Sequence, residues 1–293
     1  MKAHTCRSIA AVLVAISAVG SSSQTRSPQY PEGAAIPRSL TNLERAWLSE
    51  NLWYFGQADG EGPPPTGPVR CASEYEPMDG LLMAWEGSAS WKNILAAMAL
   101  EVTGPLGGAR VYMVVDDQSE QNSCNTTLTN AGVDVSNVFY VVRPTDTIWI
   151  RDYGPRYIYQ GGCRAIVDHI YNRPRPLDDV FPLYFSSLKA HPVYEIGLVH
   201  GGGNYHLDSV YRSYATRLIN NENPGLTEAQ IIAKWFAFQN VNTTLFNPFP
   251  QGVDSTQHLD MWMQVIADDR VVVSDWPTAP GSTQDQICDE LRL

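Results

Sequence analysis

From about residue 70 to the C-terminus, short apolar runs typical of strands alternate with stretches of helical periodicity. Small β units that each carry a helix favour an α/β architecture of similar modules, although no clear sequence repeat proves it. Helices are expected to follow Ser88, to end at Asn130 and to run from Thr227 to Trp235. The predicted strands are residues 81–85, 110–115, 138–142, around 148, 157–159, 165–167, 194–198, 214–219, 259–266 and 271–273. The apolar face predicted for the first helix consists of Trp91, Ile94, Leu95, Met98 and Val102.

The N-terminal twenty residues have the pattern of a secretory signal peptide. Lys2 and Arg7 precede an apolar run that is followed by serines, and the run is too short for a membrane span. We therefore expect a secreted or periplasmic protein from which cleavage removes Cys6. In an oxidising compartment the remaining cysteines can form one or two disulfides, whose pairing the sequence leaves open. These cysteines are Cys71, Cys124, Cys163 and Cys288.

A leader of mixed character precedes the compact domain. Residues 21–40 are rich in Ser, Pro and Gly, which is typical of a flexible segment. Thr41 and Glu44 have the spacing of a capping box, so a short helix is expected there. The Gly- and Pro-rich stretch 60–65 can be neither helix nor central strand. The expected organisation is a signal peptide (1–20), a leader with a short helix and a Pro-rich linker (21–70), and one compact domain (71–293).

Acidic side chains outnumber basic ones, and the formal net charge is −11 at pH 7. Such a surface repels nucleic acid and anionic lipid, so neither is an expected partner. It favours cationic ligands only weakly, and its ordinary meaning is solubility outside the cell.

Three polar clusters follow predicted strands. They are WIRDYGP (149–155), HGGGNYHLD (200–208) and GVDSTQHLDMW (252–262). Strand ends are candidate sites, because a rigid sheet fixes groups there that solvent still reaches. Asp152 is predicted to end a strand, where its carboxylate either meets a cationic substrate or pairs with a neighbouring arginine, Arg151 or Arg156.

His258 and Asp260 are two residues apart. In an extended chain such residues face the same side, so the imidazole and the carboxylate would project into one space. A histidine beside a carboxylate can act as general acid or base, with a structural buried histidine as the alternative. The glycines at 201–203 let the backbone approach another group closely, but the residues of a phosphate loop are missing.

A metal centre is a further alternative. His200, His206, Asp208, His258 and Asp260 are ligand types that a metal could use. Their spacing argues against it, because the sequence pairs none of them as two histidines four apart or with a Cys-x-x-Cys motif.

Five landmarks in one order resemble those of the agmatine deiminase and bacterial peptidyl-arginine deiminase family. They are EYEPMDGLLMAW (74–85), TIWIRDYGP (147–155), HGGGNYHLDS (200–209), NNENPGLTEAQI (220–231) and GVDSTQHLDMW (252–262). The resemblance covers residues 71 to about 280. It implies the pentein fold, an α/β propeller of ββαβ modules. It also implies hydrolysis of a guanidine to a ureido group with release of ammonia, without metal or cofactor.

The resemblance assigns roles to particular side chains. Asp152 and Asp260 would bind the guanidinium, His258 would transfer protons, and a cysteine thiolate would attack the guanidine carbon. Two carboxylates suit this ligand because the N–H donors of a guanidinium lie in one plane. Trp149 would wall the slot and offer a cation–π face, with core packing as the alternative.

Two arginines favour one substrate branch. Arg173 and Arg175 lie on a Pro-stiffened segment that suits binding of a carboxylate, which a peptide ending in arginine has and agmatine lacks. With the secretion signal, they favour conversion of peptidyl-arginine to peptidyl-citrulline. The alternatives are deimination of agmatine to N-carbamoylputrescine on the putrescine pathway and, for the arginines, an ordinary solvent-exposed basic loop.

The sequence departs from the family pattern at the nucleophile. The family's cysteine lies near its C-terminus, and no cysteine here stands in a matching motif. Cys288 lies in the start of an amphipathic helix and is expected to be a buried thiol or a disulfide partner. The chain is therefore expected to lack the last propeller module and to be inactive as given. A non-catalytic secreted module that binds arginine-containing ligands is the remaining alternative.

Overall fold

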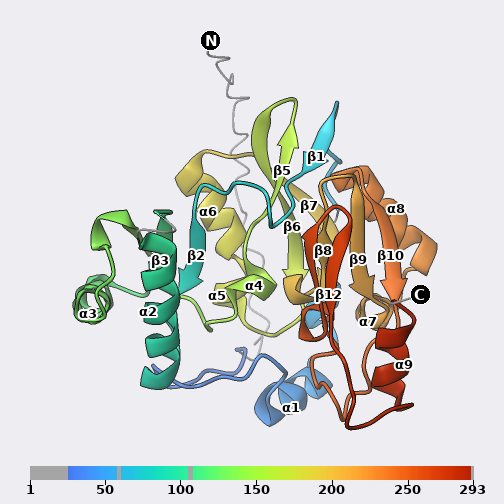
Figure 1. Ribbon diagram of the computed structural model, residues 1–293, viewed down its shortest axis with the longest axis horizontal. Coiled ribbons are helices and arrows are strands. Elements are labelled where there is room, and N and C mark those ends of the chain that lie inside the picture. Colours follow the sequence, from blue (N-terminus) through green and yellow to red (C-terminus); the bar gives the residue numbers. More distant parts are fainter. Residues whose placement is uncertain (1–25, 58–60, 105–107, 292–293) are drawn as a thin grey trace, which may run out of the picture.

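The computed structural model describes residues 26–57, 61–104 and 108–291. The predicted signal peptide and Cys6 lie outside the described residues. In the described part, the strands form small separate sheets instead of one large sheet, as the modular pattern of the sequence predicts (Figure 1). No helix in these ranges is long and apolar enough to cross a membrane.

The sheets differ in strand direction. In the four-stranded sheet, β1 (Val69–Cys71), β5 (Arg156–Gln160) and β6 (Cys163–Tyr171) are antiparallel, and β7 (Val193–His200) runs parallel to β6. A parallel sheet contains β2 (Leu81–Ala84), β3 (Val111–Val115) and β4 (Val138–Val142). In a mixed sheet, β9 (Arg212–Thr216) lies between β8 (His206–Leu207) and β10 (Asn242–Phe246). An antiparallel pair consists of β11 (Met263–Ala267) and β12 (Arg270–Val273).

Helices cover these sheets and connect them. Both α2 (Ala89–Thr103) and α3 (Gln118–Asn130) pack on β3, α6 (Phe181–Lys189) packs on β6, and α8 (Glu228–Gln239) packs on β7 and β10. Figure 1 shows the β2–β4 sheet with α2 and α3 on one side of the molecule and β8–β10 with α8 on the other. The shorter helices are α1 (Asn42–Glu50), α4 (Ile150–Tyr153), α5 (Pro176–Asp179), α7 (Leu218–Glu222) and α9 (Thr283–Asp289). The 3-10 turns are η1 (Tyr54–Gln57), η2 (Val135–Asn137), η3 (Gly202–Asn204) and η4 (Leu259–Met261).

The hydrophobic core is divided into several clusters, two of which join residues of different sheets. Trp235 and Ile158 belong to the cluster between α8 and the four-stranded sheet, and Met113 belongs to the cluster under α2 and α3. Another cluster joins Trp262 to Cys288 of α9. Because each cluster is small, polar groups can lie at the centre where the modules meet.

Residues 148 and 149 are irregular and α4 follows from Ile150, so the prediction of a strand that ends at Asp152 is wrong. In α4 the amide of Gly154 donates to the carbonyl of Ile150 at 2.7 Å. A Cβ at residue 154 would lie 2.4 Å from that oxygen, so only glycine permits this turn. Pro155 then prevents the helix from continuing, and local turn chemistry thus overrides the strand-like apolar pattern.

Two other predicted strands are shorter than expected. Residues 259–261 form η4, and β11 begins only at Met263. His258 therefore caps a turn that contains Asp260, and the two residues do not alternate along a strand. Similarly, β9 ends at Thr216, and α7 follows from Leu218.

The first long helix buries only part of the predicted face, including Leu95 and part of Val102. Ile94 and Met98 are 59% and 44% exposed, whereas Ala96 and Ala99 are buried together with Leu95. The alanines allow α2 to lie close to the sheet, and a ranking of residues by hydrophobicity misses this effect.

The described part of the leader lies against the domain. Ile36 is 6% exposed, and α1 begins with the predicted capping box. The Glu44 amide donates to Thr41 Oγ1 at 3.0 Å, and the Thr41 amide donates to the Glu44 carboxylate at 2.7 Å. The leader thus brings residues 36–44 to the centre of the molecule.

Candidate active site

Three short turns meet at the centre of the protein. The turn α4 packs on η3, and η3 packs on η4. They carry the polar landmarks of the sequence: Asp152 lies in α4 and Gly203 in η3, while His258 is the N-cap of η4 and Asp260 lies within it. The three residues assigned to guanidinium binding and proton transfer are therefore brought together.

Asp152 is a buried carboxylate with its acceptor oxygens occupied. Its Oδ1 accepts the Gly203 amide at 2.9 Å and lies 3.3 Å from His258 Nδ1. Burial by itself raises the pKa of this group, but His258, Arg38 and Arg173 outweigh burial and hold it well below its usual range. Asp152 is thus a fixed negative charge in the protein interior.

His258 is held from its backbone side by a compact turn. The Asp254 carboxylate accepts the Thr256 hydroxyl at 2.7 Å and the His258 amide at 3.1 Å. Gln257 between them has φ of +58°, a left-handed conformation that turns the chain. The imidazole is fully buried, and its Nε2 has no hydrogen-bond partner among the described residues. Its other nitrogen faces Asp152.

A guanidinium group lies between the two carboxylates, and it belongs to Arg38 of the leader. Arg38 Nε donates to Asp152 Oδ2 at 3.1 Å, and its Nη2 lies 2.9 Å from His258 Nδ1 and also pairs with Asp260. Burial opposes the charge of Arg38, but Asp152 and Asp260 raise its pKa. Burial also opposes the charge of Asp260 and raises the pKa of this carboxyl, and Arg38 only partly offsets this effect. His258 Nδ1 thus lies between the Asp152 carboxylate, which accepts protons, and the Arg38 guanidinium, which donates them.

The other predicted substrate-binding residues contact the leader backbone. Trp149 Nε1 donates to the carbonyl of residue 36 at 2.8 Å, and Arg173 Nε donates to that of residue 38 at 3.0 Å. Arg175 Nη2 donates to the carbonyls of residues 37 and 39 at 2.7 and 3.3 Å. Arg173 and Arg175 are 7% and 1% exposed, so the alternative of a solvent-exposed basic loop is wrong. Trp149 also contacts Trp91 edge-on, with ring centroids 5.3 Å apart, and both rings are partly buried.

Arg175 binds a carboxylate, and that carboxylate comes from the leader helix. Its Nε lies 2.8 Å from Glu44 Oε1, and its Nη2 lies 3.2 Å from Oε2. Both side chains are at most 1% exposed. This bidentate geometry is the strong form of an ion pair.

Gly203 explains the glycine-rich landmark. A Cβ on this residue would lie 2.0 Å from Arg38 Nη2 and 2.7 Å from oxygens of both Asp152 and Asp260. A Cβ on Gly201 would lie 2.8 Å from the imidazole of His258. The glycines thus allow the close backbone approach that the sequence predicts, and the group approached is a guanidinium held by carboxylates.

Residues 70–292 match the Porphyromonas-type peptidyl-arginine deiminase family. The chain belongs to this family. Its members are hydrolases that act on guanidino C–N bonds. A candidate agmatine deiminase of Selenomonas ruminantium is 24% identical over 211 residues, which cover 64% of this chain and 56% of that protein. The chain thus spans little more than half of that relative.

Solved structures of deiminases share the fold. The agmatine deiminase of Enterococcus faecalis superposes with a TM-score of 0.65 at 19% identity, over 78% of this chain and 69% of that one. A candidate arginine deiminase of Porphyromonas gingivalis gives 0.63 at 16% identity, over 76% and 71%. The predicted pentein-type α/β fold is therefore confirmed. The missing last module remains a prediction.

Three of the described cysteines of this deiminase-family chain, Cys71, Cys124 and Cys288, are buried. Burial raises the pKa of the Cys71 and Cys124 thiols to about 12. Cys288 is buried in the apolar cluster around Trp262, and Cys163 is disulfide-bonded. A thiol whose pKa is raised by apolar surroundings is a poor nucleophile. None of these described cysteines is thus placed as an activated thiolate.

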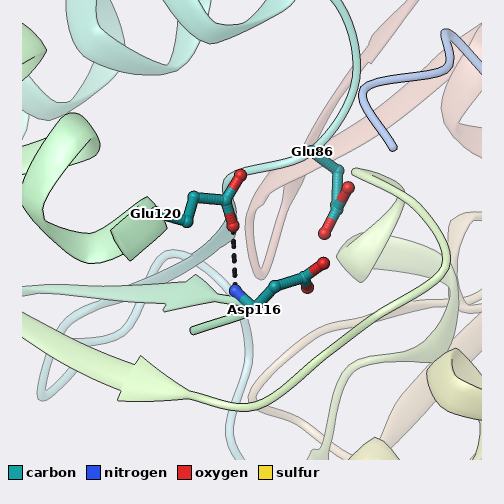
Figure 2. Close-up of side chains that lie close together, drawn as sticks. All are labelled: Glu86, Asp116 and Glu120. Carbon is teal, nitrogen blue, oxygen red and sulfur yellow. Dashed lines mark hydrogen bonds between the residues drawn. The ribbon is translucent and has the colours of Figure 1, made fainter. Parts of the chain in front are cut away.

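Another group of carboxylates lies at the ends of the parallel strands β2 and β3. Figure 2 shows Glu86, Asp116 and Glu120, whose ligand atoms lie within 4.8 Å of one another. Glu120 accepts the Asp116 amide at 2.8 Å and pairs with Lys92 at 2.8 Å. Burial, followed by the charge of Asp116, raises the pKa of Glu86. Ionisation of this pair is therefore opposed by its surroundings.

The five residues considered as metal ligands do not form such a group in the described ranges. His200 stacks on His169 with ring centroids 4.1 Å apart, and burial, followed by the charge of His169, lowers its pKa. Asp208 binds Arg212 and accepts from Tyr214 at the end of β8. The His-x-Asp pattern of residues 206–208 is thus structural, whereas that of residues 258–260 faces the guanidinium.

The sequence alone does not identify Arg38, Glu44 and Asp254. Arg38 lies in a stretch whose composition indicates flexibility, and Glu44 is explained fully by its capping box. Asp254 is part of a landmark, and its spacing to His258 is the only signal that could have pointed to its role.

Proposed function

We propose that the protein binds the guanidinium of an arginine residue and that deimination is the reaction for which its site is built. One observation carries this proposal: a guanidinium lies between Asp152 and Asp260, with His258 Nδ1 at 2.9 Å. The planar array of donors meets two carboxylates, which is the arrangement that guanidinium recognition requires. Membership of a deiminase family supports the same chemistry.

In the proposed reaction Asp152 and Asp260 hold the cation, and His258 moves protons. A thiolate adds to the guanidine carbon, ammonia leaves after taking up a proton, and water then releases the ureido product. Because the described cysteines are buried or disulfide-bonded, we propose that the 293 residues as given bind the guanidinium without turnover. Retained binding without chemistry is the non-catalytic arginine-binding alternative.

We propose arginine at the end of a peptide as the substrate. Arg173 donates to the carbonyl of the arginine whose side chain fills the site, and agmatine has neither a carbonyl nor a carboxylate there. Agmatine is the second candidate. The relatives from S. ruminantium and E. faecalis are named as a candidate agmatine deiminase and an agmatine deiminase, which favours this second candidate.

The two substrates can be separated by calorimetry with agmatine and with an N-acetylated peptide that ends in arginine. Since Arg38 fills the site, the comparison uses the Arg38→Ala variant. We expect the peptide to bind at least about tenfold tighter, which corresponds to about 1.4 kcal/mol. Adding Arg173→Ala should weaken only the peptide, and adding Asp260→Asn should weaken both ligands.

If agmatine and the peptide bind with equal affinity and Arg173→Ala changes neither affinity, the peptide assignment is contradicted. If neither ligand binds, the guanidinium site itself is contradicted. In parallel, no citrulline should form; its appearance would show that the chain has a nucleophile after all.

We also propose that the protein is secreted or periplasmic. The proposal rests on the N-terminal sequence pattern alone. N-terminal sequencing of the protein from its natural source should begin after the first twenty residues, and an intact Met1 in that material would contradict it.

A further inference from the structure

The leader meets the site at every point where an arginine peptide would. Its Arg38 guanidinium takes the two carboxylates, and its backbone carbonyls accept from Trp149, Arg173 and Arg175. Its Glu44 gives Arg175 a carboxylate. Both features of a C-terminal arginine, a guanidinium and a carboxylate, are therefore present in this one segment of the chain.

The contacts leave no room for a second guanidinium. The oxygens of Asp152 and Asp260 that would bind it already bind Arg38, whose side chain is 16% exposed. The backbone of Gly203 lies directly against the guanidinium, because a Cβ there would lie 2.0 Å from Arg38 Nη2. A ligand can enter only when residues 36–39 leave.

We propose that residues 36–44 are an intramolecular pseudosubstrate, which competes with external arginine peptides for the site between Asp152 and Asp260. This inference rests on the proposed function of the same site. A tethered segment binds at a high effective concentration. The apparent affinity for an external ligand then equals the intrinsic affinity multiplied by the fraction of molecules in which the site is open.

Two contacts hold the leader against the domain and keep Arg38 in the site. The Glu44–Arg175 pair lies in the interior, where its charges are fully shielded from water. This pair holds α1 in place, and α1 holds the segment with Arg38. Ile36 adds an apolar contact at the other end of the segment. Arg38 is thus presented to the site from two fixed points.

The test is calorimetric titration of the full chain with agmatine and with an N-acetylated peptide ending in arginine. Arg38→Ala and Arg38→Gln should each bind both ligands at least about tenfold more tightly than the unmodified protein. The matched control is Arg45→Ala, since Arg45 lies in the same leader but is exposed and donates only to the Leu40 carbonyl at 2.7 Å. It should bind like the unmodified protein. Near-UV circular dichroism establishes that the variants are folded.

The outcomes separate this inference from the proposed function. Tighter binding by both Arg38 variants that is lost when Asp152→Asn is added supports the pseudosubstrate. Equal affinity of the unmodified protein and the Arg38 variants, lost with Asp152→Asn, overturns the pseudosubstrate and leaves the guanidinium site standing. Absence of binding by the folded Arg38 variants overturns both. An equal gain in Arg45→Ala also overturns the inference, because it would reflect general loosening of the leader.

Discussion

Two groups of carboxylates lie at the ends of secondary-structure elements, and they differ in what compensates their charge. Asp152 and Asp260 surround the guanidinium of Arg38. The pKa of Asp152 is lowered despite complete burial, whereas Arg38 only partly offsets the effect of burial on Asp260. Glu86 and Asp116 face each other, and the pKa values of both are raised. The acidic side chains are of the same kind in both groups. A cation site is thus defined by the neighbours of the carboxylates and by the space between them.

The largest effect should come from the buried pair that anchors the compensated group. Glu44→Gln leaves Arg175 charged and unpaired in the interior, which is expected to cost about 3–5 kcal/mol of unfolding free energy. The measurement is urea denaturation. The control is Glu228→Gln, whose partner Arg217 is 43% exposed on the side chain and which should cost below about 1 kcal/mol. Equal losses would show that Glu44 and Arg175 are not paired in solution.

Next comes the carboxylate that contacts the guanidinium. Asp152→Asn keeps the shape but removes the charge that binds Arg38, and we expect a loss of about 2 kcal/mol at neutral pH. Since the folded-state pKa of Asp152 is below the unfolded value of about 3.9, its contribution is present above that pH and is lost as the pH falls. The difference between the two proteins should therefore shrink in acid. A constant difference would contradict the compensated state of Asp152.

The space between the carboxylates can be tested without changing any charge. Gly203→Ala places a methyl group against both carboxylates, so guanidinium affinity in the Arg38→Ala background should fall about tenfold or more, by about 1.4 kcal/mol. Gly225→Ala is the matched control, because a Cβ at residue 225 has no atom within 4 Å. Calorimetry with agmatine distinguishes them. Similar behaviour of the two variants would place the guanidinium elsewhere.

The smallest effect should have the opposite sign. Burial and the charge of Asp116 both oppose ionisation of Glu86. Glu86→Gln removes this carboxyl group, so it should stabilise the protein by about 1 kcal/mol at neutral pH. The pKa of Glu86 is raised when folded above its unfolded value of about 4.3. The folded state therefore holds the extra proton, and wild-type stability relative to the variant falls as pH rises above that value. Thermal unfolding across pH 5–9 checks this; destabilisation would show that a cation compensates Glu86.

Local sequence predicts the residues of the candidate site but not their conformations. Asp152, His258 and Asp260 could be selected because each lies in a landmark of ordered motifs. The local conformations of these residues could not be predicted from the sequence. Two short helical turns, α4 and η4, lie where the sequence predicts strands, because the Gly154-Pro155 ending and the turn around Asp254 outweigh the apolar pattern. The side chains still converge, since the packing of the three turns sets their directions.

The sequence by itself determined the α/β modules, the family, and the side chains that meet a guanidinium, because alternating apolar runs and ordered motifs are local properties of the chain. Only the tertiary structure decided which groups compensate which charges. The pairing of Arg38 with Asp152 and of Glu44 with Arg175 joins residues more than a hundred positions apart. Such contacts depend on burial and on the positions of other modules, and neither composition nor spacing records them.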